Sequence, residues 1–183
     1  MPQPHLTRLP PERMSAQAAA LREASVDLRG DATFFEVAAN APEALAWYVD
    51  RFYGEMFYSG RVPARLLELA RLRLSMLHGC KFCNQGNRVA AQSAGVTREQ
   101  IAALEADDIA AFSQEERAVL RLADELALTR HQGRMSRELH ASLSRFFSDG
   151  QIFELGLILG MLAGVAKFLF AYDLVEKEES CPL

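Results

Sequence analysis

The chain has 183 residues, of which 50% are hydrophobic and 24% are charged. Such a chain is long enough for one domain with a sizeable core and too short for two domains to be the default. Its formal net charge of −4, without a basic run that contains interleaved aromatic residues, argues against nucleic acid as a main partner.

Neither the N-terminal residues nor the most apolar stretch predicts export or membrane insertion. Residues 1–8 contain no apolar segment of the kind found in secretory signals. The most hydrophobic stretch, residues 155–166, is too short to span a bilayer. We therefore expect no membrane partner and a cytoplasmic location, where two neighbouring cysteines are more often catalytic or metal-binding than structural.

The first predicted elements are helices separated by proline and glycine. Residues 1–14 are rich in proline and are expected to be loose, and residues 15–29 then favour a helix that ends at Gly30. A proline suits the first turn of a second helix, which begins at residue 42 and breaks at residues 59–60. A leucine-rich helix over 63–78 ends at Gly79, and the next helix, 81–94, ends before Gly95.

Later helices are predicted from their capping residues. Three pairs have capping-box spacing: Thr97 with Gln100, Ser113 with Glu116, and Ser148 with Gln151. Ser136 starts a further helix, and no segment alternates as a strand would. These patterns predict a single all-α domain of about seven helices over 15–176, with a tail at 177–183. An antiparallel pair of helices, 63–78 and 81–94, is expected to form its core beneath a long helix over 149–176.

The chemistry is expected at Cys80 and Cys83, which lie two residues apart at the predicted start of a helix. Helix N-termini stabilise the thiolate, which is the reactive form, and Lys81, His78 and Arg88 could add positive charge. Two such thiols can form a redox disulfide, share a metal, or simply pack as small apolar residues. A zinc site needs two more ligands, for which no second cysteine pair exists, so the redox interpretation is preferred.

Three polar residues are candidates for assisting the cysteines. Glu68, in the leucine-rich helix, could accept a proton from a thiol, or it could form an ion pair with Arg65 or Arg71. Asn87 shares the helical face of Cys83 and can donate a hydrogen bond to a thiolate, but it cannot relay a proton. His78 can relay a proton, although a histidine at this place can also cap its helix.

Gly156, Gly160 and Gly164 repeat every four residues along the last predicted helix. Glycine inside a helix costs about 1 kcal/mol relative to alanine, so the stripe suggests that another backbone approaches closely. Alternatively, the glycines make room for large side chains of the same subunit, such as Phe168 or Trp47.

Several blocks of sequence resemble the alkyl hydroperoxidase D-like, carboxymuconolactone decarboxylase family. The resemblance rests on residues 68–73, 79–83, 94–97, 112–117 and 122–126, and it extends over about 42–175. It implies a helical fold that commonly assembles into dimers, trimers or hexamers. We therefore expect a homo-oligomer to which the last helix contributes.

The resemblance also implies a thiol peroxidase site without an organic cofactor or a metal. By position, Cys83 matches the peroxidatic thiol, Cys80 the resolving thiol and Glu68 the proton-accepting glutamate. The histidines of the family fall at Phe82 and Asn87 and are missing here, so Glu68 is expected to act through water or His78.

The predicted function is a dithiol–disulfide oxidoreductase with weak hydroperoxide-reducing, peroxiredoxin-type activity, served by a thiol reductant that the sequence does not identify. The alternatives are a decarboxylase-like enzyme without redox chemistry and a non-catalytic oligomeric binding protein. Cys181 is expected to be a surface thiol or an additional resolving group.

Overall fold

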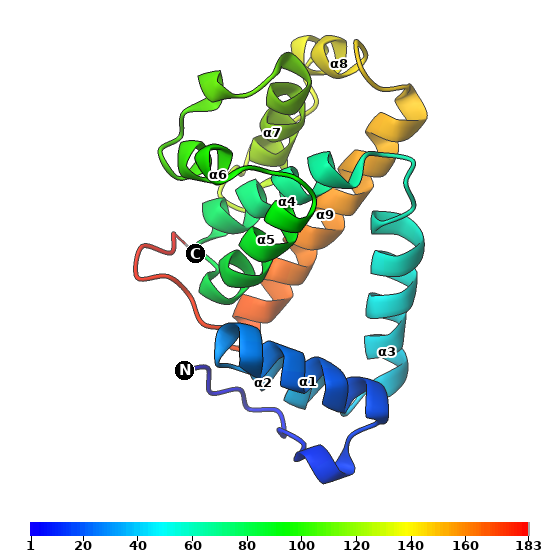
Figure 1. The fold of residues 1–183 in the computed structure, drawn as a ribbon, viewed down its shortest axis with the longest axis vertical. Helices are drawn as coiled ribbons and strands as arrows, with labels where there is room; N and C mark the ends of the chain where they lie inside the picture. The colour runs from blue at the N-terminus through cyan, green and yellow to red at the C-terminus, as the bar shows by residue number, and fades with distance from the viewer. Residues whose placement is uncertain (183) are drawn as a thin grey trace.

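The computed structural model describes residues 1–182, and these residues are almost entirely helical (Figure 1). The α-helices are α1 (Ala16–Arg29), α2 (Thr33–Ala38), α3 (Pro42–Ala46), α4 (Ala64–His78), α5 (Lys81–Ser93), α6 (Arg98–Glu105), α7 (Gln114–Leu126), α8 (Arg137–Leu143) and α9 (Asp149–Ala171). Short 3-10 turns occupy Pro11–Arg13 and Ile109–Ala111, and a π-helix, η2, occupies Trp47–Phe57. The predicted all-α class is confirmed for the described residues.

Helix boundaries follow the capping residues that the sequence contains. The three predicted capping boxes, at Thr97, Ser113 and Ser148, are all formed. Gly30 and Gly79 end α1 and α4 in the left-handed conformation, with φ of 69° and 64°. Because Gly79 turns the chain sharply, only Gly79 and Cys80 separate the end of α4 from the start of α5.

Helix α4 lies at the centre of the molecule and packs against α5, α7 and α9 (Figure 1). The predicted pairing of α4 with α5 and the cover by α9 are present, and α7 is a further partner of α4. Leu67, Leu155, Ile158 and Leu159 are fully buried between these helices. Each such side chain contributes about 1.5–3 kcal/mol through removal from water.

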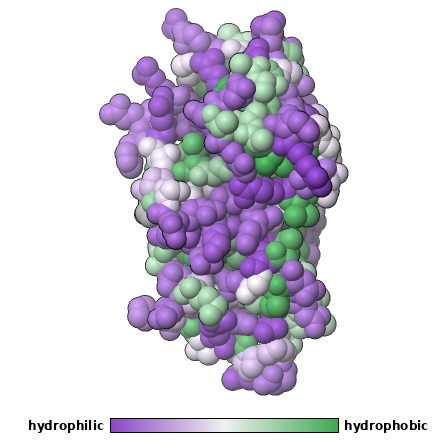
Figure 2. All heavy atoms as spheres, turned by 60° about the vertical axis from the view of Figure 1, so that its left-hand side comes forward, coloured by the Kyte–Doolittle hydropathy of each residue, from purple (hydrophilic) through white to green (hydrophobic). Residues whose placement is uncertain are grey.

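Helices α1 and α2 cross one end of the molecule, and α3 with η2 stands beside the central helices (Figure 1). The surface that Figure 2 shows is mainly hydrophilic, with hydrophobic residues in scattered groups. Residues 1–14, for which the sequence predicts a loose segment, contact the domain: Arg8 forms an ion pair with Glu36 at 2.6 Å.

Two details of the helix prediction are wrong. The described chain contains nine α-helices rather than about seven, and α2 is the one for which the sequence analysis gives no range. This helix has six residues and its N-cap residue is Ala32, whose side chain cannot form a capping hydrogen bond, so the helix carries little local signal. Helix α9 ends at Ala171 rather than at residue 176, because Asp173 adopts φ of 52° and turns Leu174 and Val175 into the core.

The helix that was predicted to begin at residue 42 is present, but most of it has π rather than α winding. The amide of Tyr58 donates to the carbonyl of Tyr53 at 2.9 Å, five residues earlier. Residues five apart therefore share a face, which brings together Tyr48, Tyr53 and Tyr58. π-Helical turns are often found at functional sites. Tyr48 and Tyr53 line the same cavity as the cysteine pair.

Helix α9 is long and apolar enough to cross a membrane by length and composition alone. Its apolar window of 18 residues is longer than the twelve-residue stretch, 155–166, that the sequence analysis considered too short to span a bilayer. Its Leu155, Ile158 and Leu159 are buried within the domain, which is the behaviour of a core helix.

Candidate active site

Cys80 and Cys83 form a disulfide at the start of α5, with their Cα atoms 5.2 Å apart. Cys80 is the N-cap residue and is completely buried, whereas Cys83 lies in the first turn and is partly exposed. The structure thus joins the two cysteines that the sequence analysis predicts as site residues. Of the two cysteines, Cys83 is the one with exposed surface.

A cavity of about 450 Å³ opens beside the cysteine pair. Its volume lies in the range of about 300–1,000 Å³ that is usual for small-molecule sites. The walls come from α1, α2, η2, α4, α5 and α9 and are mostly apolar, with Leu21, Phe34, Leu74, Val165 and Leu169 among them. Cys83, Asn87 and His78 all line this cavity, so three of the predicted site residues share one space with Cys80.

Glu68 lies behind the cavity wall. Its side chain is 2% exposed, and it forms an ion pair with Arg71 at 2.6 Å and accepts a hydrogen bond from the hydroxyl of Tyr58. The ion-pair alternative for Glu68 is therefore confirmed with Arg71, whereas Arg65 pairs with Glu116 at 2.5 Å. Arg71 lines the cavity and Glu68 does not. Glu68 is therefore connected to the site only through its ion pair with Arg71.

His78 is buried at the end of α4, where its Nε2 atom accepts a hydrogen bond from the backbone amide of Leu128 at 3.0 Å. Burial lowers the pKa of His78 from 6.5 to about 4. The imidazole is therefore neutral at pH 7, with its proton on Nδ1. The suggestion that His78 adds positive charge to the cysteines is wrong for this reason, and its ring holds the segment after α7 rather than capping α4.

Acidification should destabilise the protein through His78. Between pH 6.5 and about 4 the unfolded chain binds a proton at this residue and the folded chain does not, so the free energy of unfolding falls as the pH falls. The loss should be about 2 kcal/mol between pH 7.5 and pH 4.5. Urea denaturation at both pH values measures it. His78→Gln, which keeps an acceptor for Leu128, should show a pH dependence smaller by about that amount; an equal pH dependence in the two proteins would contradict the assignment.

The other two predicted cations face away from the cavity. Lys81 pairs with Glu176 at 3.1 Å, and Arg88 pairs with Glu105 at 2.6 Å, both at the surface. Arg29 and Arg71 are instead the positively charged residues that line the cavity. Local spacing could not reveal this, because Arg29 belongs to α1 and lies 54 residues from Cys83 in the sequence.

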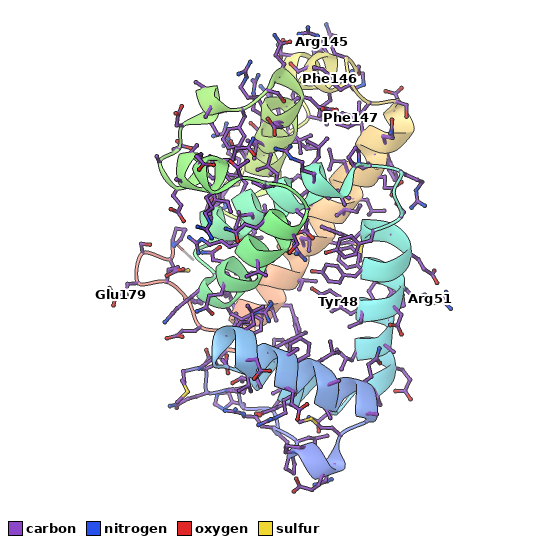
Figure 3. All side chains as sticks on the ribbon, in the orientation of Figure 1. Tyr48, Arg51, Arg145, Phe146, Phe147 and Glu179 are labelled. Atoms are coloured by element: carbon purple, nitrogen blue, oxygen red, sulfur yellow. A yellow bond between two sulfur atoms is a disulfide. The ribbon has the colours of Figure 1, made fainter. Side chains whose placement is uncertain are left out.

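Tyr48 and Tyr53 also line the cavity and were not predicted as site residues. Their hydroxyl oxygens are 3.4 Å apart, and the guanidinium of Arg71 lies 5.5 Å from the ring centroid of Tyr53. Figure 3 shows Tyr48 on the inner side of η2 and Arg51 on the outer side. Burial raises the pKa of Tyr48 well above its ordinary value, so its hydroxyl stays protonated. Their spacing of five residues is the sequence pattern that could have identified Tyr48 and Tyr53 as neighbours in the site.

The C-terminal segment covers the start of α5. The amide of Glu178 donates to the carbonyl of Gly79 at 2.8 Å, and Cys80 forms an isolated bridge with Lys177. The thiol of Cys181 donates to the carbonyl of His78 at 3.2 Å. A Cβ atom on Gly79 would lie 2.6 Å from the Cα of Cys181, so glycine is required there both for its φ and for this close approach. Cys181 is thus held next to Cys80 and is partly buried.

Residues 1–182 contain no group of three or more histidine, cysteine, aspartate or glutamate side chains arranged to hold a metal ion. The groups that the described site offers for chemistry include its two thiols and the polar side chains of the cavity.

Comparison with known proteins agrees with this geometry. Residues 42–125 match the sequence profile of the carboxymuconolactone decarboxylase family. This part of the chain is similar in sequence to that family. The predicted resemblance is confirmed, although the matched segment ends at residue 125 rather than near 175. It contains α4, α5 and the cysteine pair.

One curated relative is YdfG, an uncharacterised protein of Bacillus subtilis strain 168. It is 29% identical over 96 residues, which make up 52% of this chain and 65% of YdfG. The chain thus spans just under two thirds of the length of this relative.

Solved structures of the same fold include a protein of unknown function from Agrobacterium tumefaciens, named as a candidate AhpD antioxidant defence protein. It has 22% identity and a TM-score of 0.64, covering 74% of this chain and 91% of its own. The debrominase Bmp8, solved with 2,3,4-tribromopyrrole, has 17% identity and a TM-score of 0.72, covering 97% and 93%. At these identities the likeness establishes the AhpD-like helical fold.

Proposed function

We propose that the protein is a dithiol–disulfide oxidoreductase that reduces hydroperoxides, with Cys83 as the nucleophile and Cys80 as the resolving thiol. The observation that carries the proposal is the asymmetric pair: a partly exposed Cys83 at the wall of an apolar cavity, joined to a fully buried Cys80. The cytoplasm, where the disulfide would be reduced again, is the location that suits this role.

The proposed reaction balances with these two thiols and one peroxide. The Cys83 thiolate attacks the terminal oxygen of a hydroperoxide, the O–O bond breaks, and the alkoxide leaves and takes up a proton to give the alcohol. Cys83 is then a sulfenic acid. The Cys80 thiol attacks the sulfur of Cys83 and releases water, which forms the disulfide. An external thiol reductant restores both thiols.

Proton transfer is the weak part of this site. The proton of Cys83 is proposed to reach Glu68 through water or His78, because Asn87 cannot carry it. Both oxygens of Glu68 already have partners in Arg71 and Tyr58, and Nε2 of His78 is engaged by Leu128. We therefore propose a low rate of peroxide turnover.

The proposal predicts that one equivalent of tert-butyl hydroperoxide converts the reduced protein from three free thiols to one. Reduced protein, freed of reductant, would be treated with the peroxide, titrated for thiols and mapped by mass spectrometry. The expected product contains a Cys80–Cys83 disulfide. Three remaining thiols would reject the redox role and favour the decarboxylase-like or non-catalytic alternatives.

A second candidate is the reductive removal of halogen from a small aromatic ring. Phe34, Phe35, Tyr48, Tyr53 and Phe82 line the cavity beside the dithiol, which suits a ring-shaped substrate. The two thiols would become a disulfide while a carbon–bromine bond becomes a carbon–hydrogen bond and bromide leaves. Incubating the reduced protein with 2,3,4-tribromopyrrole tests this candidate, since it requires one bromide per disulfide formed.

We also propose that the exposed face of α9 packs against a second copy of the chain. Only 44% of its most apolar 18 residues is buried, Phe153 is 72% exposed, and Gly156, Gly160 and Gly164 face open space. Light scattering at micromolar concentration should report at least twice the mass of one chain. Leu157→Arg should lower that mass, whereas Val26→Arg, at an exposed site on α1, should leave it unchanged. A monomeric wild-type protein would contradict the proposal.

A further inference from the structure

Arg29 brings a positive charge into the cavity that no carboxylate of the described chain neutralises. Its Nε atom donates to the carbonyl of Phe82 at 3.2 Å, and its guanidinium lies 4.6 Å from the ring centroid of Phe82. Within residues 1–182, no aspartate or glutamate lies within ion-pair distance of Arg29. Its two terminal amino groups therefore have hydrogen-bonding capacity to offer a ligand.

Gly86 provides the space that Arg29 occupies. A Cβ atom at this position would lie 2.0 Å from Nη2 of Arg29, so any larger residue would push the guanidinium aside. Gly86 is inside α5, where glycine costs about 1 kcal/mol relative to alanine. It is also one helical turn after Cys83, so the guanidinium and the reactive sulfur lie near the same face of α5.

The charges that line the cavity leave an excess of one positive charge. Arg29 and Arg71 both line it, and no aspartate or glutamate does. Glu68 neutralises Arg71 from behind, and His78 is uncharged at pH 7. The Nε atom of Arg71 is buried without a hydrogen-bond partner in residues 1–182.

The rest of the cavity wall is suited to an apolar group. Leu21, Leu28, Val49, Leu74 and Leu162 contribute to it, together with aromatic rings. A substrate that matches this wall has an apolar body and a single negative charge. A carboxylate fits better than a phosphate monoester because it carries one charge, whereas a phosphate monoester carries about −1.5 to −2 at pH 7. A guanidinium can bind the carboxylate through two parallel hydrogen bonds.

We infer that the cavity selects organic hydroperoxides that carry a carboxylate, and that Arg29 binds this carboxylate while the apolar body lies against the wall near Cys83. The inference rests on the proposed function for its reaction, but the preference for an apolar carboxylate is a property of the cavity alone. It can therefore be measured in the disulfide form, in which no peroxide is reduced.

Octanoate and octanol are suitable probes, because they share an alkyl chain and differ in charge. Isothermal titration of the oxidised protein at pH 7.5 should give a Kd for octanoate that is about tenfold or more below that for octanol. Arg29→Met should abolish this preference. Arg88→Met is the matched control: it removes the same charge from the outer surface of α5 and should leave the preference intact.

Gly86→Ala provides a second test that keeps Arg29 in place in the sequence. Alanine suits a helix interior, so the fold should be retained while the new Cβ displaces the guanidinium. This variant should also lose the preference for octanoate. Equal binding of the two probes by the wild-type protein, binding of neither, or a preference that survives both Arg29→Met and Gly86→Ala would overturn the inference.

Turnover separates this inference from the proposed function. With the reduced protein, Arg29→Met should raise KM for a fatty-acid hydroperoxide about tenfold and leave KM for cumene hydroperoxide unchanged. A preference for octanoate without any peroxide reduction would reject the peroxidase and retain the ligand class. If the protein reduces peroxides but Arg29→Met changes KM equally for both substrates, the carboxylate preference is rejected and the proposed peroxidase function is retained.

Discussion

Cys83→Ser should reduce the rate of hydroperoxide consumption to that of the uncatalysed reaction, because a serine hydroxyl does not supply a nucleophile comparable to the thiolate at neutral pH. Cys80→Ser should instead complete a single turnover and stop with Cys83 as a sulfenic acid. Peroxide consumption by each pre-reduced variant after removal of the reductant, and dimedone labelling followed by mass spectrometry, measure the two outcomes.

Cys181→Ser is the matched control for these variants, since serine can keep the hydrogen bond to the carbonyl of His78. It should form the Cys80–Cys83 disulfide in the first turnover as the wild-type protein does. If Cys80→Ser were to consume peroxide at the rate of Cys83→Ser, and Cys83 remained unlabelled, the assignment of Cys83 as the nucleophile would be wrong.

The parts of the fold that the sequence predicts correctly are those with strong local signals. Capping boxes at Thr97, Ser113 and Ser148 satisfy free amides at the helix starts, and Gly30 and Gly79 can adopt the left-handed conformation that ends a helix. These effects act within a few residues, so the sequence alone reveals them. Helix α2 lacks such a cap and is held by packing, which the sequence pattern does not express.

The tyrosines on η2 and at its C-terminal end show a pattern that the sequence contains and that the helix prediction did not use. The spacing of five residues between Tyr48, Tyr53 and Tyr58 fits i→i+5 winding, whereas an α-helix would place these residues on different faces. No local sequence pattern identifies Arg29 as a residue of the site. The place of Arg29 over α5 depends on how α1 packs, and Gly86, which the sequence analysis did not consider, is the residue of α5 that leaves space for this contact.

Asn87→His should raise the rate of peroxide reduction by about 10²-fold, at the lower end of the range for a positioned general base. Position 87 lies one turn after Cys83 on the same face of α5, and both residues line the cavity. An imidazole there could accept the Cys83 proton directly, without the engaged groups of Glu68 and His78. Steady-state kinetics with tert-butyl hydroperoxide measure the change.

A pH profile distinguishes proton transfer by this new histidine from an unspecific change of the cavity. The activity gained by Asn87→His should fall as the pH drops below about 6.5, because a protonated imidazole no longer accepts a proton. Asn87→Gln, which keeps the amide and adds one methylene, should stay close to the wild-type rate at every pH. If the histidine and glutamine variants had equal rates, proton transfer from Cys83 would not be the slow step, and the missing histidine would not explain weak turnover.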